Sequence, residues 1–322
     1  MIEVMAVDVA QGGWCVARPE GEPVVFLRHA LPGERVRARV TEVTARFARA
    51  DAVEILDPSP DRVQAPCPSA RPGGCGGCDW QHASLPAQRG LKATVITQHL
   101  RRLAGVDLDV TVEPLPGDED DGSAGSVASA DPGTDASTDS VGDNSKKRQP
   151  GFGWRTRVQF AVRDDGLAGL RGHRSHEVVD VGDCLIAHPA IRELGIPRLR
   201  WDGAAGVEAL TSGDESAVIV TEDDDRRGGR RPSRRAGAWG SGGGSTVRSA
   251  KAIPEGATAV TAQTVLSRAG RRVTPVRGRP YLTRHAAGRE WRVSAGSFWQ
   301  VHPAAADTLV AAVVGALEPR PG

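Results

Sequence analysis

The sequence predicts a multidomain, mainly β protein, and three observations carry this expectation. The chain has 322 residues, which is long enough for two or three domains. Apolar and polar residues alternate with a period of two in its N-terminal part, as in a half-buried strand. Two low-complexity segments then interrupt the sequence. Aromatic residues make up only 4% of the chain, so we expect cores built from Val, Leu and Ala.

Residues 1–59 are expected to form a small, OB-like β-barrel. After the turn Leu31–Glu34, apolar and basic side chains alternate. The apolar set is Val36, Ala38 and Val40, and the basic set is Arg35, Arg37 and Arg39. Small barrels of this kind often bind oligonucleotides on one face. The segment also carries many carboxylates, so a solvated arginine face without a ligand remains an alternative.

Residues 60–112 contain the most distinctive motif, a dense cysteine cluster. Cys67, Cys75 and Cys78 fall within twelve residues, and Cys184 offers a distant fourth thiol. Thiolates at this density select soft metals. Zinc prefers paired Cys-x₂-Cys knuckles, whereas only one is present here. The pattern therefore favours an iron–sulfur cluster, with zinc and unligated buried thiols as alternatives.

A helix is expected directly after the cysteines, from Ser84 to Gly105. Ser84 is a suitable N-cap, Pro86 lies in the first turn, and Gly105 is a natural C-terminal stop. Cys15 stands apart from the cluster in a strand context, and we interpret it as a small buried hydrophobe. The histidines near the cysteines in sequence are interpreted as packing or surface residues: His82, His173, His176 and His188.

The second half of the chain is expected to be a central β domain at residues 151–295. An acidic, disordered insertion at 113–150 precedes it, and a flexible insertion with an arginine run lies within it at 222–250. The expected strands are 154–162, 167–170, 177–181, 217–221 and several within 258–293, with a hairpin turn at 164–166. A final helix is expected from Pro303 to Leu317.

The charge and the cysteine usage limit the class of protein. The net charge is +1, so any nucleic-acid surface must be a local patch. Five cysteines in 322 residues do not make a disulfide scaffold. The sequence shows neither a secretory signal nor an apolar run long enough to span a membrane. We therefore expect a cytoplasmic, monomeric protein.

The order of parts resembles the bacterial RNA (uracil-5-)methyltransferase family, in its TRAM-containing iron–sulfur branch. Residues 12–18 and 31–36 look like a TRAM barrel, and residues 75–82 are similar to the family's cluster loop. The stretch 154–158, together with the later Cys184, resembles its central domain. Residues 297–302 resemble the Phe-Phe-Gln-Val-Asn stretch that opens its methyltransferase domain, with Trp299 and His302 as departures.

The resemblance implies a [4Fe-4S] cluster held by Cys67, Cys75, Cys78 and Cys184, although Cys67 lies two residues further upstream than the commoner spacing. It also implies that Gln300 contacts S-adenosylmethionine. Residues 296–322 would then be the start of an α/β methyltransferase domain, truncated at Gly322.

The function implied by the resemblance is an S-adenosylmethionine-dependent RNA uracil-C5 methyltransferase, with 23S rRNA favoured over tRNA as the substrate. Neither the nucleophilic thiol nor the base of that reaction is identifiable among these residues. We therefore expect this chain alone to bind RNA without transferring a methyl group. A non-enzymatic RNA-binding iron–sulfur or zinc protein is the alternative function.

Overall fold

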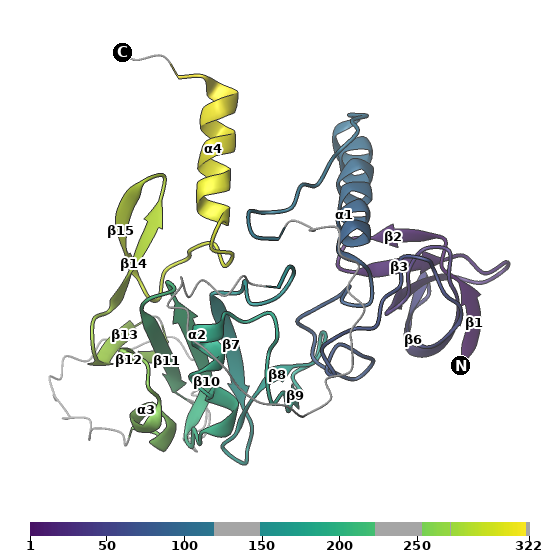
Figure 1. Ribbon diagram of the computed structural model, residues 1–322. Coiled ribbons are helices and arrows are strands. Elements are labelled where there is room, and N and C mark those ends of the chain that lie inside the picture. The colour runs from purple at the N-terminus through teal and green to yellow at the C-terminus, as the bar shows by residue number, and fades with distance from the viewer. Residues whose placement is uncertain (119–148, 223–252, 271, 320–322) are drawn as a thin grey trace, which may run out of the picture. The chain divides into compact units, whose positions relative to one another are not determined.

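The computed structural model describes residues 1–118, 149–222, 253–270 and 272–319 (Figure 1). Most of the two predicted insertions, including the arginine run, lies outside the described residues. The chain divides into two compact units. The first unit comprises residues 1–155 together with 302–322, and the second comprises residues 156–301.

The N-terminal part of the first unit is a six-stranded sheet in the order β1-β5-β6-β4-β3-β2. Its strands are β1 (Ile2–Met5), β2 (Asp8–Ala10), β3 (Trp14–Ala17), β4 (Val24–Arg28), β5 (Arg35–Val43) and β6 (Phe47–Asp57). Neighbouring strands are antiparallel except for β4 and β6. The predicted alternation along β5 is confirmed, because Val36 and Ala38 are fully buried whereas Arg37 and Arg39 are exposed.

Small aliphatic side chains fill the core of this sheet, as the low aromatic content requires. The buried set includes Val4, Ala6, Ala17, Val25, Leu27, Ala30, Val36, Ala38, Ala50 and Ala52. Cys15 belongs to the same cluster and is fully buried, which confirms its interpretation as a small buried hydrophobe. Burying such methyl and methylene groups supplies the main driving force for closing the sheet.

The predicted helix after the cysteines is confirmed. Helix α1 spans Leu85–His99, and the Ser84 hydroxyl accepts a hydrogen bond of 3.3 Å from the Ala87 N–H. A π-helical turn, Leu100–Ala104, continues it. The chain then leaves the helix at Gly105, which has a φ of 66°. This left-handed conformation explains why a glycine ends the helix.

The second unit is built on a seven-stranded sheet in the order β13-β12-β11-β10-β7-β8-β9. Its strands are β7 (Arg157–Val162), β8 (Ala168–Arg171), β9 (Val178–Val179), β10 (Ala204–Thr211), β11 (Ser216–Glu222), β12 (Thr264–Ala269) and β13 (Arg272–Arg277). Only β11 and β12 pair in parallel. Short helices lie between strands: α2 (Pro189–Arg192), the 3₁₀ turn Ile196–Arg198 and α3 (Glu255–Ala259).

Trp201 lies at the centre of the second unit's core. Its side chain is fully buried, and its indole N–H donates a hydrogen bond of 2.9 Å to the Ile196 carbonyl. A Cβ added at Gly256 would lie 2.8 Å from the indole, so α3 packs on the ring at closest approach. Strands β7, β10, β11 and β12 contribute the surrounding aliphatic residues.

Two sequence-based boundaries need correction, and one strand was missed. The strand predicted from Trp154 begins at Arg157, because the Trp154 indole turns back to the Gly151 carbonyl at 3.2 Å. The region from 258 opens with the end of α3, and its first strand begins at Thr264. Strand β10 was not predicted, because its sequence lacks a period of two and is buried on both faces.

A two-stranded hairpin follows the large sheet, formed by β14 (Tyr281–Ala286) and β15 (Arg289–Ser294). Figure 1 shows this hairpin extending beyond the seven-stranded sheet. The last helix, α4 (Ala305–Leu317), begins two residues after Pro303 rather than at it. The His302 ring accepts a hydrogen bond from the Ala304 N–H at 3.2 Å, which fixes this start. Within the described residues, no helix has the length and apolar character needed to cross a membrane.

Candidate functional site

The cysteine loop, defined here as residues 63–82, is closed at its base by backbone pairing. Arg62 and Ala83 form an isolated antiparallel bridge. The Val63 N–H donates to the His82 carbonyl at 3.0 Å, and the Ser84 N–H donates to the Asp61 carbonyl at 2.9 Å. The loop therefore leaves β6 and enters α1 from one fixed stem, so its position is set by whatever holds that stem.

A buried ion pair between Glu34 and Arg62 holds the stem to the barrel. The Glu34 carboxylate is fully buried and faces the Arg62 guanidinium with both oxygens, at 2.5 and 2.7 Å. It also accepts hydrogen bonds from the N–H groups of Leu31 at 2.8 Å and Ser59 at 3.0 Å. The Arg62 Nη2 group also donates a hydrogen bond of 2.9 Å to the His29 carbonyl. Both oxygens of the buried carboxylate thus accept hydrogen bonds, as the burial of a charge requires.

The balance of forces on Glu34 keeps it ionised. Burial alone would raise its pKa, but the hydrogen bonds from Arg62, Ser59 and Leu31 outweigh burial and lower the pKa below its ordinary value. His82, at the other end of the loop, is buried with its ring 3.3 Å from the Ala30 carbonyl, and burial lowers its pKa. This confirms His82 as a packing residue.

A direct contact between Gly13 and Asp79 sets the distance between barrel and loop. Gly13 has a φ of 75°, and a Cβ there would lie 2.2 Å from the Asp79 Cβ. Asp79 also pairs with the buried Arg28, whose nitrogen lies 3.7 Å from the carboxylate. Position 13 therefore requires a glycine for two reasons. Its backbone is left-handed, and the loop approaches too closely to leave room for a side chain.

The three local thiols are half-buried, and those of Cys75 and Cys78 accept hydrogen bonds from the loop itself. The Gly77 N–H donates to the Cys75 sulfur at 3.3 Å, and the Gln81 amide donates to the Cys78 sulfur at 3.1 Å. The Gln81 carbonyl oxygen accepts from the Cys67 N–H at 3.2 Å. Gln81 thus links the first and last cysteines of the loop. Sequence reasoning gave it no such role.

Arginines provide the positive charge around the thiols. Burial raises the pKa of Cys75, and the nearby Cys67 raises it further, whereas the Gly77 N–H, Arg155 and Arg28 oppose this rise. Three N–H groups in these surroundings are buried without a hydrogen-bond partner: Arg28 Nη2, Trp80 Nε1 and Arg155 Nε. The sulfides of an iron–sulfur cluster accept such N–H hydrogen bonds, so the residues of the loop fit a cluster in donor type and charge.

Cys184 belongs to the second unit, whereas the other three candidate ligands belong to the first. It is half-buried and packs against the Trp201 core. It lines a cavity of about 340 Å³ that also includes Arg192 and Arg198. Within the described residues, no three His, Cys, Asp or Glu side chains gather closely enough to hold one metal ion. The four-cysteine centre therefore stays a prediction.

Cys15 differs from the half-buried loop cysteines because it is fully buried in the barrel core. Its thiol donates to the Ala30 carbonyl at 3.1 Å, and burial together with the Glu34 charge raises its pKa to about 12. A thiol with this pKa carries almost no thiolate at neutral pH, so it is unsuited to nucleophilic attack.

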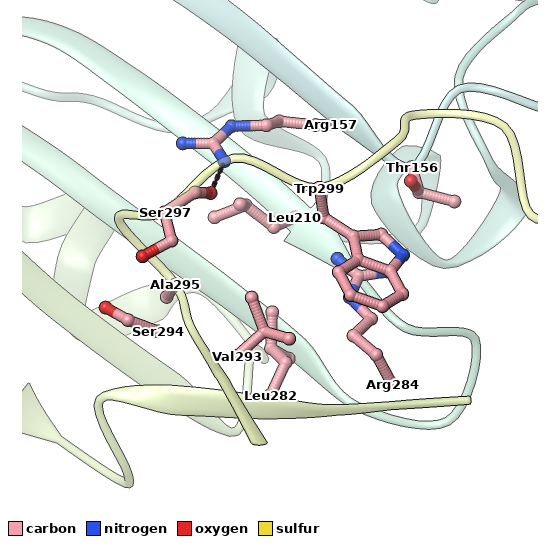
Figure 2. Close-up of a pocket in the computed structure, with 10 residues that line it drawn as sticks. All are labelled: Thr156, Arg157, Leu210, Leu282, Arg284, Val293, Ser294, Ala295, Ser297 and Trp299. Carbon is pink, nitrogen blue, oxygen red and sulfur yellow. Dashed lines mark hydrogen bonds between the residues drawn. The ribbon is translucent and has the colours of Figure 1, made fainter. Parts of the chain in front are cut away.

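A small pocket in the second unit lies beside the motif that contains Gln300 (Figure 2). Arg284, Arg157 and Trp299 line it, and Figure 2 shows the Arg284 side chain pointing toward Trp299. Arg284 is buried and donates to the Thr211 carbonyl at 2.5 Å. Burial, and then the Arg157 charge, lower its pKa to about 10, so it remains a cation at neutral pH.

The segment carrying Gln300 is fixed by Thr156. The Val301 carbonyl accepts hydrogen bonds from the Thr156 N–H at 2.8 Å and from its hydroxyl at 2.9 Å. Gln300 is half-buried and is not among the residues lining the pocket. The pocket's free volume of about 10 Å³ holds about one water. It does not accommodate S-adenosylmethionine, and the predicted Gln300 contact remains untested.

Comparisons with known proteins show which proteins this chain resembles. Residues 2–53 match the TRAM domain family. The match confirms the TRAM assignment of the N-terminal barrel. The chain is also 46% identical to a protein of Streptomyces coelicolor named as an uncharacterized RNA methyltransferase. That similarity covers 99% of this chain and 61% of the relative.

Further relatives carry related names. A Streptomyces avermitilis protein, also named as an uncharacterized RNA methyltransferase, is 44% identical over 99% of this chain and 64% of its own length. The 23S rRNA (uracil(1939)-C(5))-methyltransferase RlmD of Halomonas elongata is 33% identical over 60% of this chain and 33% of that protein. The chain thus spans about three fifths of the length of the two Streptomyces relatives.

One solved structure shares the fold. The Pyrococcus abyssi tRNA (uracil-54, C5)-methyltransferase, solved with S-adenosyl-L-homocysteine, matches with a TM-score of 0.55 and 16% identity. The match covers 97% of this chain and 64% of that one. At this identity the similarity speaks for the fold alone.

Replacing Glu34 by Gln should destabilise the barrel, because the buried Arg62 charge loses its counterion. We expect a loss of about 3 kcal/mol at neutral pH, the scale seen when one partner of a buried ion pair is removed. Because the folded pKa of Glu34 is depressed, the carboxylate's contribution is complete above its ordinary value of 4.5 and is lost as the pH falls through the folded value. Hydrogen exchange of β5 and β6 amides measures both effects.

The control for this variant is Glu20→Gln, at an exposed carboxylate. It should leave the stability of β5 and β6 unchanged. The proposed role of the ion pair would be contradicted if Glu34→Gln and the parent protein had nearly the same stability. It would also be contradicted if their difference in stability grew in acid.

Replacing Gly13 by Ala should displace the cysteine loop, because the new methyl group would overlap Asp79. We expect lost hydrogen-exchange protection for Gly74 and Cys75, whose N–H groups bond within the loop. Gly21→Ala is the matched control, since Gly21 has nearly the same φ, 73°, but nothing within 4 Å of the added Cβ. Equal protection in the two variants would show that the Gly13–Asp79 contact does not position the loop.

Proposed function

We propose that this chain is the RNA-recognition part of an S-adenosylmethionine-dependent RNA (uracil-C5-) methyltransferase. The observation that carries the proposal is 46% identity, over 99% of the chain, to a protein named as an RNA methyltransferase. The TRAM match at residues 2–53 supports it, since small barrels of this type are common oligonucleotide binders. The cysteine loop held on that barrel supports the iron–sulfur branch of the family.

We favour 23S rRNA as the substrate. The relatives from Halomonas elongata and Methylococcus capsulatus are both named as 23S rRNA uracil-C5 methyltransferases, at 33% and 32% identity. The tRNA enzyme from Pyrococcus abyssi is only 16% identical, so its substrate has less weight. Transfer RNA remains the alternative substrate.

The [4Fe-4S] cluster of this proposal would be held by Cys67, Cys75, Cys78 and Cys184. When bound, such a cluster supplies a rigid centre whose irons are all occupied by protein thiolates. Arg28 and Arg155 would offset the negative charge of the thiolates. Gln81 would keep Cys67 and Cys78 in their present relation through its two hydrogen bonds.

Methyl transfer to C5 of uracil in this family proceeds through a thiolate that adds to the base, which must first leave its stack. The five cysteines are otherwise assigned in this proposal. Four are cluster ligands, and Cys15 is a buried thiol with a pKa of about 12. If this assignment holds, these 322 residues supply no nucleophilic thiol, and the alternative function is a non-enzymatic RNA-binding iron–sulfur or zinc protein.

The proposal predicts that the 322-residue chain binds RNA but transfers no methyl group. Binding to a folded 23S rRNA fragment should weaken steeply as salt rises, because phosphate contacts release counterions. Filter binding against salt concentration measures this, with tRNA as the competitor. Incubation of the same complex with methyl-labelled S-adenosylmethionine measures transfer.

Each outcome has a consequence. Tighter binding of the rRNA fragment supports the favoured substrate, whereas tighter binding of tRNA supports the alternative. Label appearing in uracil would show that the cysteine assignment is wrong. Absence of any RNA binding would contradict the proposed function.

A further inference from the structure

Two stretches of this chain are rich in positive charge: the arginine run at 226–235, which lies outside the described residues, and residues 271–300 of the second unit. Residues 271–300 contain seven arginines and one glutamate, with no lysine and no aspartate. Residues 1–59, which include the barrel, contain seven arginines and nine carboxylates. The chain as a whole has a net charge of +1. Residues 271–300 are therefore basic in a molecule whose total charge is nearly balanced.

The arginine face of the barrel is largely neutralised by its own carboxylates. Arg35 pairs with Glu3 at 2.5 Å and with Asp57 at 2.8 Å. Arg37 pairs with Glu54 in the same way. Exposed pairs of this kind contribute little to stability. They do, however, remove the unbalanced charge that a phosphate backbone would need.

The exposed arginines of the second unit are different. Arg272, Arg279, Arg289 and Arg292 are all exposed, and none forms an ion pair with a carboxylate in the part of the chain that the structure describes. Arg268, just before them, is instead held by the buried Glu208 at 3.1 Å. Four guanidinium groups are thus free to meet an anionic partner.

Aromatic rings lie among these guanidinium groups on the β14–β15 hairpin. In an antiparallel pair, directly opposite residues share a face. Trp291 lies opposite Arg284, next to the Ala286–Arg289 pair on the same face. The Trp291 ring is 47% exposed, and its indole N–H donates to the Ala286 carbonyl at 3.2 Å. On the other face, the Arg292 guanidinium lies over the Tyr281 ring, 5.6 Å from its centroid.

The hairpin is anchored firmly enough to present these groups. Leu282 at its start and Ala295 just after it are buried with Leu210, Ile219 and Leu266 of the large sheet. Strand β15 itself is exposed along almost its whole length. The arrangement is a rigid base with an accessible, basic and aromatic strand.

We propose that the exposed strand β15 and the turn before it bind unpaired RNA, through Arg289 and Trp291 on one face of the hairpin and Arg292 on the other. The inference rests on the proposed function, because it names the part of the chain that grips the RNA substrate. Guanidinium groups would contact successive phosphates, and Trp291 would stack on a base. Unpaired RNA is favoured over duplex because a duplex hides the faces of its bases from an aromatic side chain.

The surface predicts a specific loss of salt dependence. The double variant Arg289→Gln/Arg292→Gln should lower the slope of log binding constant against log salt by about 1.4, at about 0.7 for each phosphate contact to a single strand. The matched control is Arg163→Gln/Arg200→Gln, which removes the same charge from two arginines of the same unit that pair with Asp165 and Asp202 and should leave the slope unchanged. A short uridine-rich single-stranded RNA is the probe, and fluorescence anisotropy gives the affinity.

The stacking contact has its own test. Trp291→Ala should weaken binding roughly tenfold, and Trp291→Phe should retain most of the affinity because it keeps an aromatic face. Unchanged hydrogen exchange in β10, β11 and β12 would show that these variants remain folded. Since the Phe variant cannot donate the bond to Ala286, it also separates stacking from hairpin stability.

The outcomes separate this inference from the proposed function. If the parent chain binds RNA but the Arg289→Gln/Arg292→Gln and Arg163→Gln/Arg200→Gln variants have equal slopes, the proposed RNA-binding surface is wrong and the proposed function stands. Equal affinity for a duplex of the same sequence, or displacement by heparin with no effect of Trp291→Ala, would indicate a general polyanion or acidic-protein site and would overturn the inference. If the parent chain binds no RNA, the proposed function itself fails.

Discussion

The buried ion pair between Glu34 and Arg62 is the constraint on which the first unit depends. It joins the turn before β5 to the stem of the cysteine loop, and it satisfies a carboxylate that is wholly removed from water. A buried charge left alone is expensive, so neither partner can be lost without moving the stem. The Gly13–Asp79 contact then fixes the far side of the loop. Two contacts from the barrel thus determine where three thiols lie.

Arginines have different surroundings in the barrel and in the second unit. On the barrel, Arg35, Arg37 and Arg49 are paired with carboxylates of neighbouring strands. On β13 to β15, arginines lie exposed beside aromatic rings without carboxylate partners among the described residues. A fold can therefore be nearly neutral overall and still offer one surface suited to an RNA backbone. The net charge of +1 conceals this division.

Much of the fold could be predicted because local patterns decided it. The alternation along β5, the Ser84 cap, the Gly105 stop and the burial of Cys15 all follow from short-range sequence signals. Strand β10 could not be predicted, because burial on both faces removes the alternation of apolar and polar residues that marks a half-buried strand.

The contacts that hold the candidate site could not be predicted from the sequence. Glu34 and Arg62 are twenty-eight residues apart, and no periodic pattern links them. The same holds for Arg28, whose position beside the cysteine loop depends on how β4 lies in the sheet. The cysteine motif itself was visible from its spacing, whereas the groups that support it depend on tertiary packing.

The most direct test of the account is the iron, acid-labile sulfide and zinc content of anaerobically purified protein, measured beside a Cys184→Ala variant. We expect iron and sulfide in nearly equal amounts in the parent protein, and their loss in the variant. Zinc without sulfide, or no metal in either protein, would contradict the cluster that the cysteine loop is proposed to hold.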